Sequence, residues 1–329
     1  ILEGGAGEIV SVLLPIPVAR PYDYRVPAGM IVKKGQYVRV PLGARAVPGV
    51  VWGRGSGQVA VAKIKPINAL FQLPPMSAEL QKLVDWVAHY YLAPLGSVLR
   101  MAMSVPTALE PPRRPKSYVD AGSRPKRVTP QRARVLAVLS DGLPRAGTDL
   151  CQLAGVAPAV VRGLADAGHL KVVAGTSPPE SIGPDPNFFL PTLSNIQQVA
   201  ADKLCNSVRA GRFGVHLLDG VTGSGKTEVY FEAIAAALKA GYQALVLLPE
   251  IALSAQWLSR FESRFGVRPA VWHSELGTAA RRENWRAICS ARTPLVVGAR
   301  SALFLPFAKL GLIVADEEHD ASYKQEEGV

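Results

Sequence analysis

Residues 220–227 have the sequence Gly-Val-Thr-Gly-Ser-Gly-Lys-Thr, which matches every fixed position of the pattern G-x-x-x-x-G-K-[ST]. Its three glycines allow a tight turn in which successive main-chain N–H groups converge on phosphate oxygens. Lys226 is expected to reach the β- and γ-phosphates of a nucleotide, and the Thr227 hydroxyl is expected to bind Mg²⁺. A chance glycine turn is the alternative. The predicted nucleotide-binding residues are Gly220, Val221, Thr222, Gly223, Ser224, Gly225, Lys226 and Thr227.

The residues on either side of this loop favour a strand–loop–helix unit. Val215, Leu217 and Leu218 form a short apolar run before the loop, which predicts a strand. After the loop, apolar residues recur with helical spacing between positions 228 and 238. A helix that begins at the loop directs the positive end of its dipole toward the phosphates. This context favours a nucleotide site over a chance turn.

A second candidate site lies near the end of the sequence. Residues 312–315 are an apolar run, predicted as a buried parallel strand, and Asp316, Glu317, Glu318 and His319 follow it. In phosphoryl transfer one acid holds Mg²⁺ and another residue positions or deprotonates the attacking water. Asp316 is predicted in the first role and Glu317 in the second, with Lys226 as the third catalytic residue. A solvated helix start is the alternative explanation of such an acidic cluster.

The bulk properties limit the class of protein. A chain of 329 residues has room for two or three domains, and 48% hydrophobic with 19% charged residues is typical of a soluble globular protein. The net charge of +11 favours a polyanionic partner such as nucleic acid. The three cysteines, Cys151, Cys205 and Cys289, are widely spaced, as expected for reduced thiols of a cytoplasmic protein rather than a disulfide framework or zinc site. We expect no membrane segment and no signal peptide.

The pattern along the chain predicts a multidomain α/β protein. Residues 1–109 are rich in short apolar runs separated by glycines, which predicts a small β-barrel or compact sheet followed by a helix near residues 77–91. The aromatic residues of that helix, Trp86, Tyr90 and Tyr91, are expected to pack in the core. Residues 110–129 are rich in arginine, lysine and proline, which predicts a basic linker that either touches DNA phosphates or acts only as a tether.

The rest of the chain divides into two folded parts. Residues 130–174 have three short helical patterns and then an apolar stretch, the order of a winged helix, a domain that contacts either DNA or other proteins. Residues 175–189 form a linker rich in proline, serine and glycine. In residues 190–329 strands and helices alternate, which predicts a RecA-like parallel α/β lobe.

Four strings of residues occur in order and at the spacing of helicase motifs. They are residues 220–230, Leu-Pro-Glu-Ile-Ala-Leu at 248–253, Gly-Ala-Arg-Ser-Ala-Leu-Phe at 298–304, and Asp-Glu-Glu-His-Asp-Ala-Ser-Tyr-Lys-Gln-Glu-Glu-Gly at 316–328. Together they closely resemble the PriA family of bacterial replication-restart helicases. The resemblance covers nearly the whole chain and implies a 3′-end DNA-binding domain, a winged helix and the first helicase lobe.

The resemblance also implies roles for individual residues. Gln197 matches the glutamine that recognises adenine in this superfamily, so the expected cofactors are ATP and Mg²⁺. The DNA 3′ end is expected to bind Tyr22, Asp23, Tyr24, Gly43 and Lys63. In that pocket an aromatic face stacks on the base, a carboxylate accepts the 3′-hydroxyl and a lysine binds phosphate. The single-stranded DNA path is expected to include Pro249, Glu250, Arg300 and Ser301.

By resemblance, the parent protein is an ATP-dependent 3′-to-5′ DNA helicase that recognises stalled or repaired forks and initiates primosome assembly. Its expected partners are forked and single-stranded DNA, primosome proteins, single-stranded DNA-binding protein and the replicative helicase loader, in the cytoplasm at the nucleoid. The family's second lobe, with its arginine finger and its zinc-binding cysteines, is absent from this sequence. We expect no zinc site here, and we expect this chain alone to bind DNA without unwinding it.

Two alternatives remain. The first alternative to the helicase is a non-hydrolysing, fork-binding primosome loader, and the second is another DNA translocase of helicase superfamily 2. The intact glycine-rich loop argues against the first alternative. The Asp-Glu-Glu-His string and the predicted 3′-end pocket argue against the second.

Overall fold

The computed structural model describes residues 3–5, 7–111, 116–125, 127–174, 183–221, 223–249 and 255–323. Two of the predicted site residues, Thr222 and Glu250, lie outside these ranges. The chain forms two compact units, one of Ile1–Glu110 with Ile182–Val329 and one of Pro111–Ser181. Within the described ranges, no helix combines the length and the apolar composition needed to cross a membrane.

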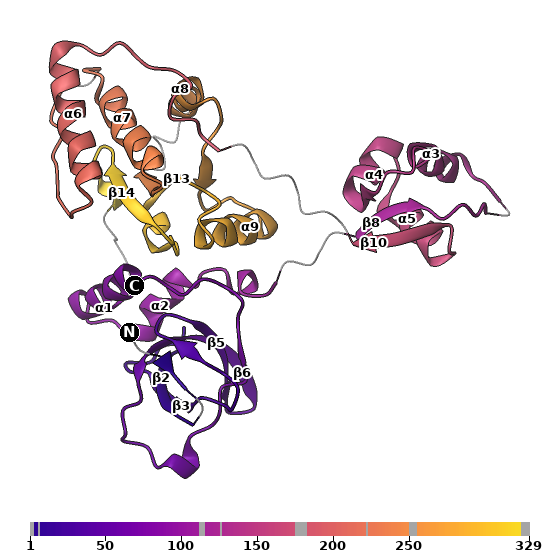
Figure 1. Cartoon of the computed structure of the whole chain (residues 1–329), viewed down its shortest axis with the longest axis horizontal. Coiled ribbons are helices and arrows are strands. Elements are labelled where there is room, and N and C mark those ends of the chain that lie inside the picture. The colour runs from indigo at the N-terminus through magenta and orange to yellow at the C-terminus, as the bar shows by residue number, and fades with distance from the viewer. Residues whose placement is uncertain are drawn as a thin grey trace. The chain divides into compact units, whose positions relative to one another are not determined.

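The chain begins with a small antiparallel β-barrel (Figure 1). Its sheet has the order β3-β2-β6-β5-β7, from strands β2 (Ile9–Leu13), β3 (Tyr22–Arg25), β5 (Tyr37–Leu42), β6 (Arg45–Arg54) and β7 (Ala69–Leu70). A separate pair joins β1 (Glu3–Gly4) to β4 (Val32–Lys33), and η1 is Val61–Lys63. The stretch before β7 pairs with β3 at the opposite edge: Arg25 N donates to Lys65 O at 3.0 Å, and Ile67 N donates to Arg25 O at 3.0 Å. These bonds close the sheet, which confirms the expected β-rich domain.

The helix predicted near residues 77–91 is α1 (Ala78–Tyr90), whose first turn is capped by the Ser77 hydroxyl. It is followed by α2 (Leu95–Ala102) and η2 (Pro106–Ala108). The expectation that its aromatic residues pack in the core is wrong: Trp86, Tyr90 and Tyr91 are 57%, 65% and 54% exposed. The buried stripe of α1 includes Leu80 and Val84, and Trp86 lies about 200° around the helix from Val84. The apolar side of α1 is thus filled by aliphatic side chains.

The second unit packs three helices on a three-stranded antiparallel sheet of order β10-β8-β9. Its elements are β8 (Lys116–Asp120), α3 (Pro130–Val138), β9 (Arg145–Ala146), α4 (Gly147–Ala154), α5 (Pro158–Asp166) and β10 (Leu170–Ala174). Residues 116–120 fall in the predicted basic linker, but they form β8 and pair with β10 over five residues. Ser117 and Tyr118 are buried there, so this segment is part of the folded unit and not a tether.

The C-terminal part of the first unit is a parallel α/β lobe, as the alternation predicts (Figure 1). Its sheet has the order β12-β13-β11-β14, with β11 (Gln243–Leu247), β12 (Ala270–Trp272), β13 (Leu295–Gly298) and β14 (Leu310–Ala315). The helices are α6 (Asn195–Ala210), α7 (Lys226–Lys239), α8 (Ala255–Phe265) and α9 (Thr278–Cys289), with η4 (Arg300–Phe304) and η5 (Ala321–Tyr323).

The two faces of this sheet have separate cores because side chains alternate along each strand. Ala244 and Val246 of β11 pack with α7 and α8 in one cluster. Leu245 and Leu247 pack on the other side with α9, in a cluster that continues into the N-terminal domain. The lobe is therefore a three-layer structure whose second face is covered partly by the N-terminal barrel domain.

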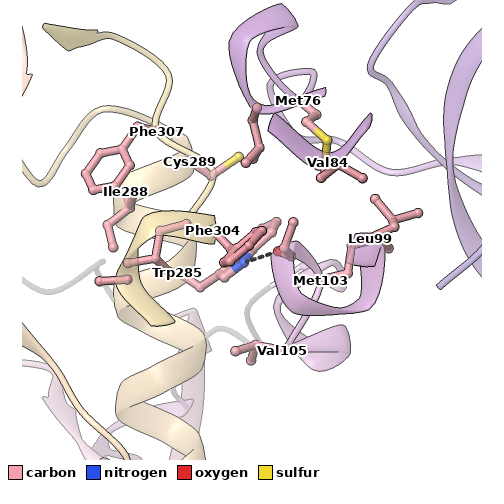
Figure 2. Packing of buried hydrophobic residues seen from close by; sticks show 14 of the residues in the cluster. Met76, Val84, Leu99, Met103, Val105, Trp285, Ile288, Cys289, Phe304 and Phe307 are labelled. Atoms are coloured by element: carbon pink, nitrogen blue, oxygen red, sulfur yellow. Dashed lines mark hydrogen bonds between the residues drawn. The ribbon is translucent and has the colours of Figure 1, made fainter. Parts of the chain in front are cut away.

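Trp285 of α9 lies at the centre of that junction and is fully buried. Its indole Nε1 donates to the main-chain oxygen of Ala102 at 3.3 Å, the dashed line in Figure 2. Arg286 donates from Nη1 to the oxygens of Ala108 at 2.6 Å and Glu110 at 2.8 Å. Figure 2 shows Trp285 and Phe304 of the lobe close to Met103 of the N-terminal domain. The barrel domain and the lobe thus share one hydrophobic core.

Two sequence expectations about strands of the lobe are wrong. Residues 215–218 form no strand, and Val215 and Leu217 are 83% and 81% exposed. The predicted buried strand is β14, but it lies at the edge of the described sheet and Ile313 is 47% exposed. A strand needs a hydrogen-bonding neighbour, and among the described residues β14 has one only on its β11 side.

Candidate nucleotide site and DNA interface

The glycine-rich loop leads directly into α7, whose first residue is Lys226. Gly225 precedes the helix with φ +83°, which favours glycine, and a Cβ there would lie 2.4 Å from Gln197 Nε2, so any larger residue would displace the Gln197 side chain. Lys226 Nζ donates to Gly220 O at 2.7 Å, which folds the lysine back over the loop. The free N–H groups at the start of α7 and this ammonium group are suited to bind phosphate.

Gln197, the predicted adenine-recognising residue, lies beside this loop. Its Oε1 accepts from Ser194 N at 2.9 Å and its Nε2 donates to Ser224 O at 2.9 Å. The first bond belongs to a capping box at the start of α6, because the Ser194 hydroxyl accepts from Gln197 N in return. The start of α6 is thereby attached to the loop, and the glutamine is near the expected nucleotide.

Asp316 follows β14 and comes into contact with α7. Its Oδ2 accepts a hydrogen bond from Tyr230 Oη at 2.9 Å, and its Oδ1 accepts from Glu317 N at 3.1 Å. Its main-chain N–H donates to Leu247 O, and its carbonyl oxygen accepts from Tyr323 Oη at 2.8 Å. Burial, and next the negative charge of Asp316, raise the pKa of Tyr323 well above its usual value. Both the side chain and the main chain of Asp316 are therefore held in place by hydrogen bonds.

The oxygen atoms available here fit Mg²⁺. This ion prefers oxygen ligands and keeps several waters, so one hydroxyl and one carboxylate are a sufficient protein contribution beside phosphate oxygens. Thr227 is the second residue of α7, and Asp316 is hydrogen-bonded to Tyr230 three residues further along the same helix. Thr227 and Asp316 are the residues that would hold the ion. The described residues contain no group of three or more His, Cys, Asp or Glu side chains that could hold a metal by itself.

Glu317, the predicted water-activating residue, has a left-handed backbone with φ +49°. This conformation is uncommon for a residue other than glycine and often occurs at functional sites. Its side chain is 46% exposed, and a carboxylate oxygen lies 3.6 Å from His319 Nε2. The two neighbouring acids differ in exposure: Asp316 is half-buried and Glu317 is exposed to solvent.

The two predicted DNA-path segments meet at the carboxyl ends of neighbouring strands. Leu248 N donates to Gly298 O at 3.0 Å, which places the residues after β11 beside those after β13. Ser301 is exposed, and Nη1 of the half-buried Arg300 has no hydrogen-bond partner within the described residues. Pro249 is buried, so its side chain is not accessible to DNA in this structure. A guanidinium group is suited to bind phosphate, but this nitrogen is buried and would have to be uncovered before DNA could reach it.

The predicted 3′-end residues are arranged around β3. Side chains alternate along a strand, so Tyr22 and Tyr24 lie on one face and Asp23 on the other. Tyr24 is buried, and its Oη donates to Pro41 O at 3.1 Å, which connects β3 to the turn that contains Gly43. Tyr22 is 42% exposed and remains available for stacking. The two tyrosines therefore differ: one is structural and one is accessible.

Asp23 is held by the loop that follows β6. Ser56 N donates to both carboxylate oxygens, at 2.9 and 3.0 Å, and Ser56 Oγ donates to Oδ2 at 2.7 Å. Two residues along β3, Arg25 Nη2 donates to Ile64 O at 3.0 Å and Val61 O at 3.4 Å, which fixes the segment that contains the exposed Lys63. These bonds attach the segments bearing Gly43 and Lys63 to the strand bearing Asp23.

Sequence reasoning did not identify Tyr230 or Ser56 as parts of the sites. Tyr230 could have been found, because it lies four residues after Lys226 and therefore on the same face of the helix. Ser56 is 33 residues from Asp23 and has no motif of its own, so only the barrel brings the two together.

Comparison with known proteins identifies both parts of the first unit. Residues 11–104 match the family of the PriA 3'DNA-binding domain (3'BD), and residues 194–329 match the DEAD/DEAH box helicase family. The first match covers the barrel with α1 and α2, and the second covers the parallel α/β lobe.

Whole-chain relatives give the same result. The chain is 34% identical over 322 residues to the replication restart protein PriA of Rickettsia conorii, covering 98% of this chain and 39% of that protein. It is 33% identical to PriA of Haemophilus influenzae, covering 97% of this chain and 45% of that protein. For PriA of Bacillus subtilis the identity is 29%, covering 94% of this chain and 48% of the relative. The chain thus spans less than half the length of these relatives.

Proposed function

The chain belongs to the PriA family of replication restart proteins. We propose that it binds the 3′ end of a DNA strand at a fork and that its helicase lobe binds Mg·ATP. In this proposal it forms the N-terminal part of an ATP-dependent 3′-to-5′ DNA helicase that restarts replication. The barrel recognises the 3′ end of the strand, and the helicase lobe contacts single-stranded DNA. The net charge of +11 favours binding to the polyanion.

In the nucleotide site, Lys226 leaves Gly220 O and binds the β- and γ-phosphates together with the main-chain N–H groups of residues 223–226. Gln197 recognises adenine, Thr227 and Asp316 hold the metal, and bound Mg²⁺ neutralises charge on the phosphate oxygens. Glu317 orients the attacking water and accepts its proton. Its exposed carboxylate is free to approach a water on the far side of the phosphate.

At the 3′ end, Tyr22 stacks on the terminal base and Asp23 accepts a hydrogen bond from the 3′-hydroxyl. Lys63 binds a backbone phosphate, and the turn at Gly43 allows close approach of the strand, because a residue without a side chain leaves space there. Arg300 and Ser301 contact the single strand in the lobe. A strand that ends in a 3′-phosphate has no 3′-hydroxyl hydrogen to donate to Asp23, so it lacks this bond.

By family, the proposed partners are primosome proteins, single-stranded DNA-binding protein and the loader of the replicative helicase, acting at the nucleoid in the cytoplasm. The family's zinc ligands belong to the second helicase lobe, outside the residues present here. The second unit, with its helix-turn-helix order and added strand β8, is proposed as a winged helix that contacts fork DNA.

The observation that carries the proposal is the hydrogen bond between Tyr230 Oη and Asp316 Oδ2, 86 residues apart in sequence. It brings the acidic end of β14 to the helix that begins at the glycine-rich loop. A chance glycine turn and a solvated acidic cluster would have no reason to meet. This contact favours a single site with a phosphate loop and a metal-binding carboxylate.

The test is ATP hydrolysis and fork binding by this chain, with Lys226→Ala as the control. We expect the chain to bind forked DNA tightly and to bind nucleotide in a Mg²⁺-dependent manner. The two kinds of binding are measured separately. DNA-stimulated turnover that Lys226→Ala abolishes would show that the chain hydrolyses ATP without the family's second lobe. Fork binding without any nucleotide binding would instead support the non-hydrolysing loader.

A further inference from the structure

A chain of hydrogen bonds leads from two buried side chains, Trp257 of α8 and Tyr230 of α7, to the half-buried Asp316 at the end of β14. Trp257 Nε1 donates to Tyr230 Oη at 2.8 Å, and Tyr230 Oη donates to Asp316 Oδ2 at 2.9 Å. Trp257 is 6% exposed and Tyr230 is 5% exposed. The three residues come from α8, α7 and the end of β14, so the chain connects three elements of the lobe.

The direction of these bonds is determined by chemistry. An indole N–H can only donate, so Trp257 occupies a lone pair of the Tyr230 oxygen. The single hydroxyl hydrogen of Tyr230 is then available for Asp316, which as a carboxylate can only accept. The arrangement has one stable polarity.

The carboxylate of Asp316 is fixed from both sides. Tyr230 donates to Oδ2 and Glu317 N donates to Oδ1, so rotation of the carboxylate would break one or both bonds. Each oxygen keeps further lone pairs for a cation. Groups that hydrogen-bond to a metal ligand orient it, and their removal typically weakens metal binding by about 10- to 100-fold.

We infer that Tyr230 is the positioning residue of the metal-binding carboxylate, with Trp257 fixing the direction of its hydroxyl. This inference rests on the proposed binding of Mg·ATP and adds to it two residues that touch neither the nucleotide nor the ion. A purely structural tie between α7 and β14 is the competing explanation. The two explanations differ in one property, the dependence of nucleotide binding on Mg²⁺.

The experiment measures binding of a fluorescent ATP analogue to the 329-residue chain, first in EDTA and then over a Mg²⁺ titration. The variant Tyr230→Phe keeps the ring, which packs edge-on against Phe231 at 5.4 Å, and removes only the hydroxyl. We expect about a 10-fold rise in the Mg²⁺ concentration at half-saturation, with binding in EDTA unchanged. For Trp257→Phe we expect a smaller rise in the same direction, on the order of 3-fold.

Tyr37→Phe is the matched control. The Tyr37 hydroxyl is also buried but has no hydrogen-bond partner within the described residues, so its removal is expected to leave the Mg²⁺ titration unchanged. Thermal unfolding of each variant separates loss of folding from loss of metal binding. If Tyr230→Phe does not fold, the shift measured for Trp257→Phe decides the question.

Three outcomes would overturn the inference. An unchanged Mg²⁺ titration in both variants would show that the hydroxyl does not position the ligand. Equal losses of nucleotide binding in EDTA and in Mg²⁺ would favour the structural tie. A complete lack of Mg-dependent binding by the unsubstituted chain would overturn the proposed nucleotide site itself, and the inference with it.

Discussion

Trp285 Nε1 of the helicase lobe donates a hydrogen bond to Ala102 O of the 3′DNA-binding domain, at 3.3 Å and in a fully buried position. The indole also lies edge-on to the ring of Tyr37 in the barrel, with ring centroids 5.8 Å apart. A single side chain thus contacts both parts of the barrel domain, its sheet and its second helix. This contact makes the two domains one structural unit.

We therefore predict that Trp285→Ala lowers the free energy of unfolding by about 3–5 kcal/mol, as for other fully buried tryptophans. Chemical denaturation measures it. Trp86→Ala is the control, because Trp86 is 57% exposed, and its effect should stay below about 0.5 kcal/mol. Similar losses in the two variants would mean that Trp285 does not join the domains.

The glycine-rich loop allows a comparison of two glycines with similar backbones. Gly223 and Gly225 have φ +81° and +83°, but only at Gly225 would a Cβ clash, 2.4 Å from Gln197 Nε2. Gly225→Ala should weaken nucleotide binding by about 10-fold or more, because strain of about 1–2 kcal/mol adds to the clash. Gly223→Ala should weaken nucleotide binding less, since there the added side chain causes backbone strain but no clash. Titration with a fluorescent ATP analogue measures both, and a larger effect at Gly223 would contradict the geometry.

The hydroxyl of Ser56 should contribute to recognition of the 3′ end. Ser56→Ala keeps the main-chain N–H bond to Asp23 and loses the 2.7 Å bond from Oγ, worth about 1–2 kcal/mol. We expect binding to forks with a 3′-hydroxyl to weaken by about 5-fold, with little change for forks that end in a 3′-phosphate. Ser56→Thr should restore binding.

The same comparison tests Asp23 itself. Asp23→Ala should weaken binding to 3′-hydroxyl forks and leave 3′-phosphate forks nearly unchanged, because only the hydroxyl donates to the carboxylate. Lys63→Ala should weaken both substrates similarly, since it contacts phosphate. Equal losses on both substrates for Asp23→Ala would remove Asp23 from the proposed pocket.

Cys289 predicts a pH dependence of stability. Burial, the main cause, raises the pKa of its thiol to about 12 in the folded chain. The unfolded thiol loses its proton near pH 9, so above that pH the unfolded state binds fewer protons and the free energy of unfolding falls until the folded pKa is reached. Compared with Cys289→Ala, the unsubstituted chain should lose about 1.4 kcal/mol more between about pH 8 and pH 10. Urea unfolding at the two pH values measures it, and parallel losses would refute it.

Local patterns were sufficient for much of the lobe. The loop at Gly220, the helix after it and the alternating strands and helices follow from short-range chemistry, because glycine conformation and hydrophobic period act over a few residues. The same reasoning found the helix of residues 78–90, but it placed Trp86 on the wrong side. Periodicity identifies an apolar face only when one face is clearly polar.

Pairing between distant residues depended on the tertiary structure. No local signal shows that residues 116–120 pair with β10, that residues 215–218 form no strand, or that Ser56 reaches Asp23. A strand forms only where another strand completes its hydrogen bonds, and a polar side chain is oriented only by groups that folding brings to it. The chemistry that the loop at 220–227 and the acids at 316–317 can perform therefore follows from residue types and short-range spacing. The contact of Tyr230 with Asp316, which joins these segments, depends on folding, because the two residues are 86 positions apart in the chain.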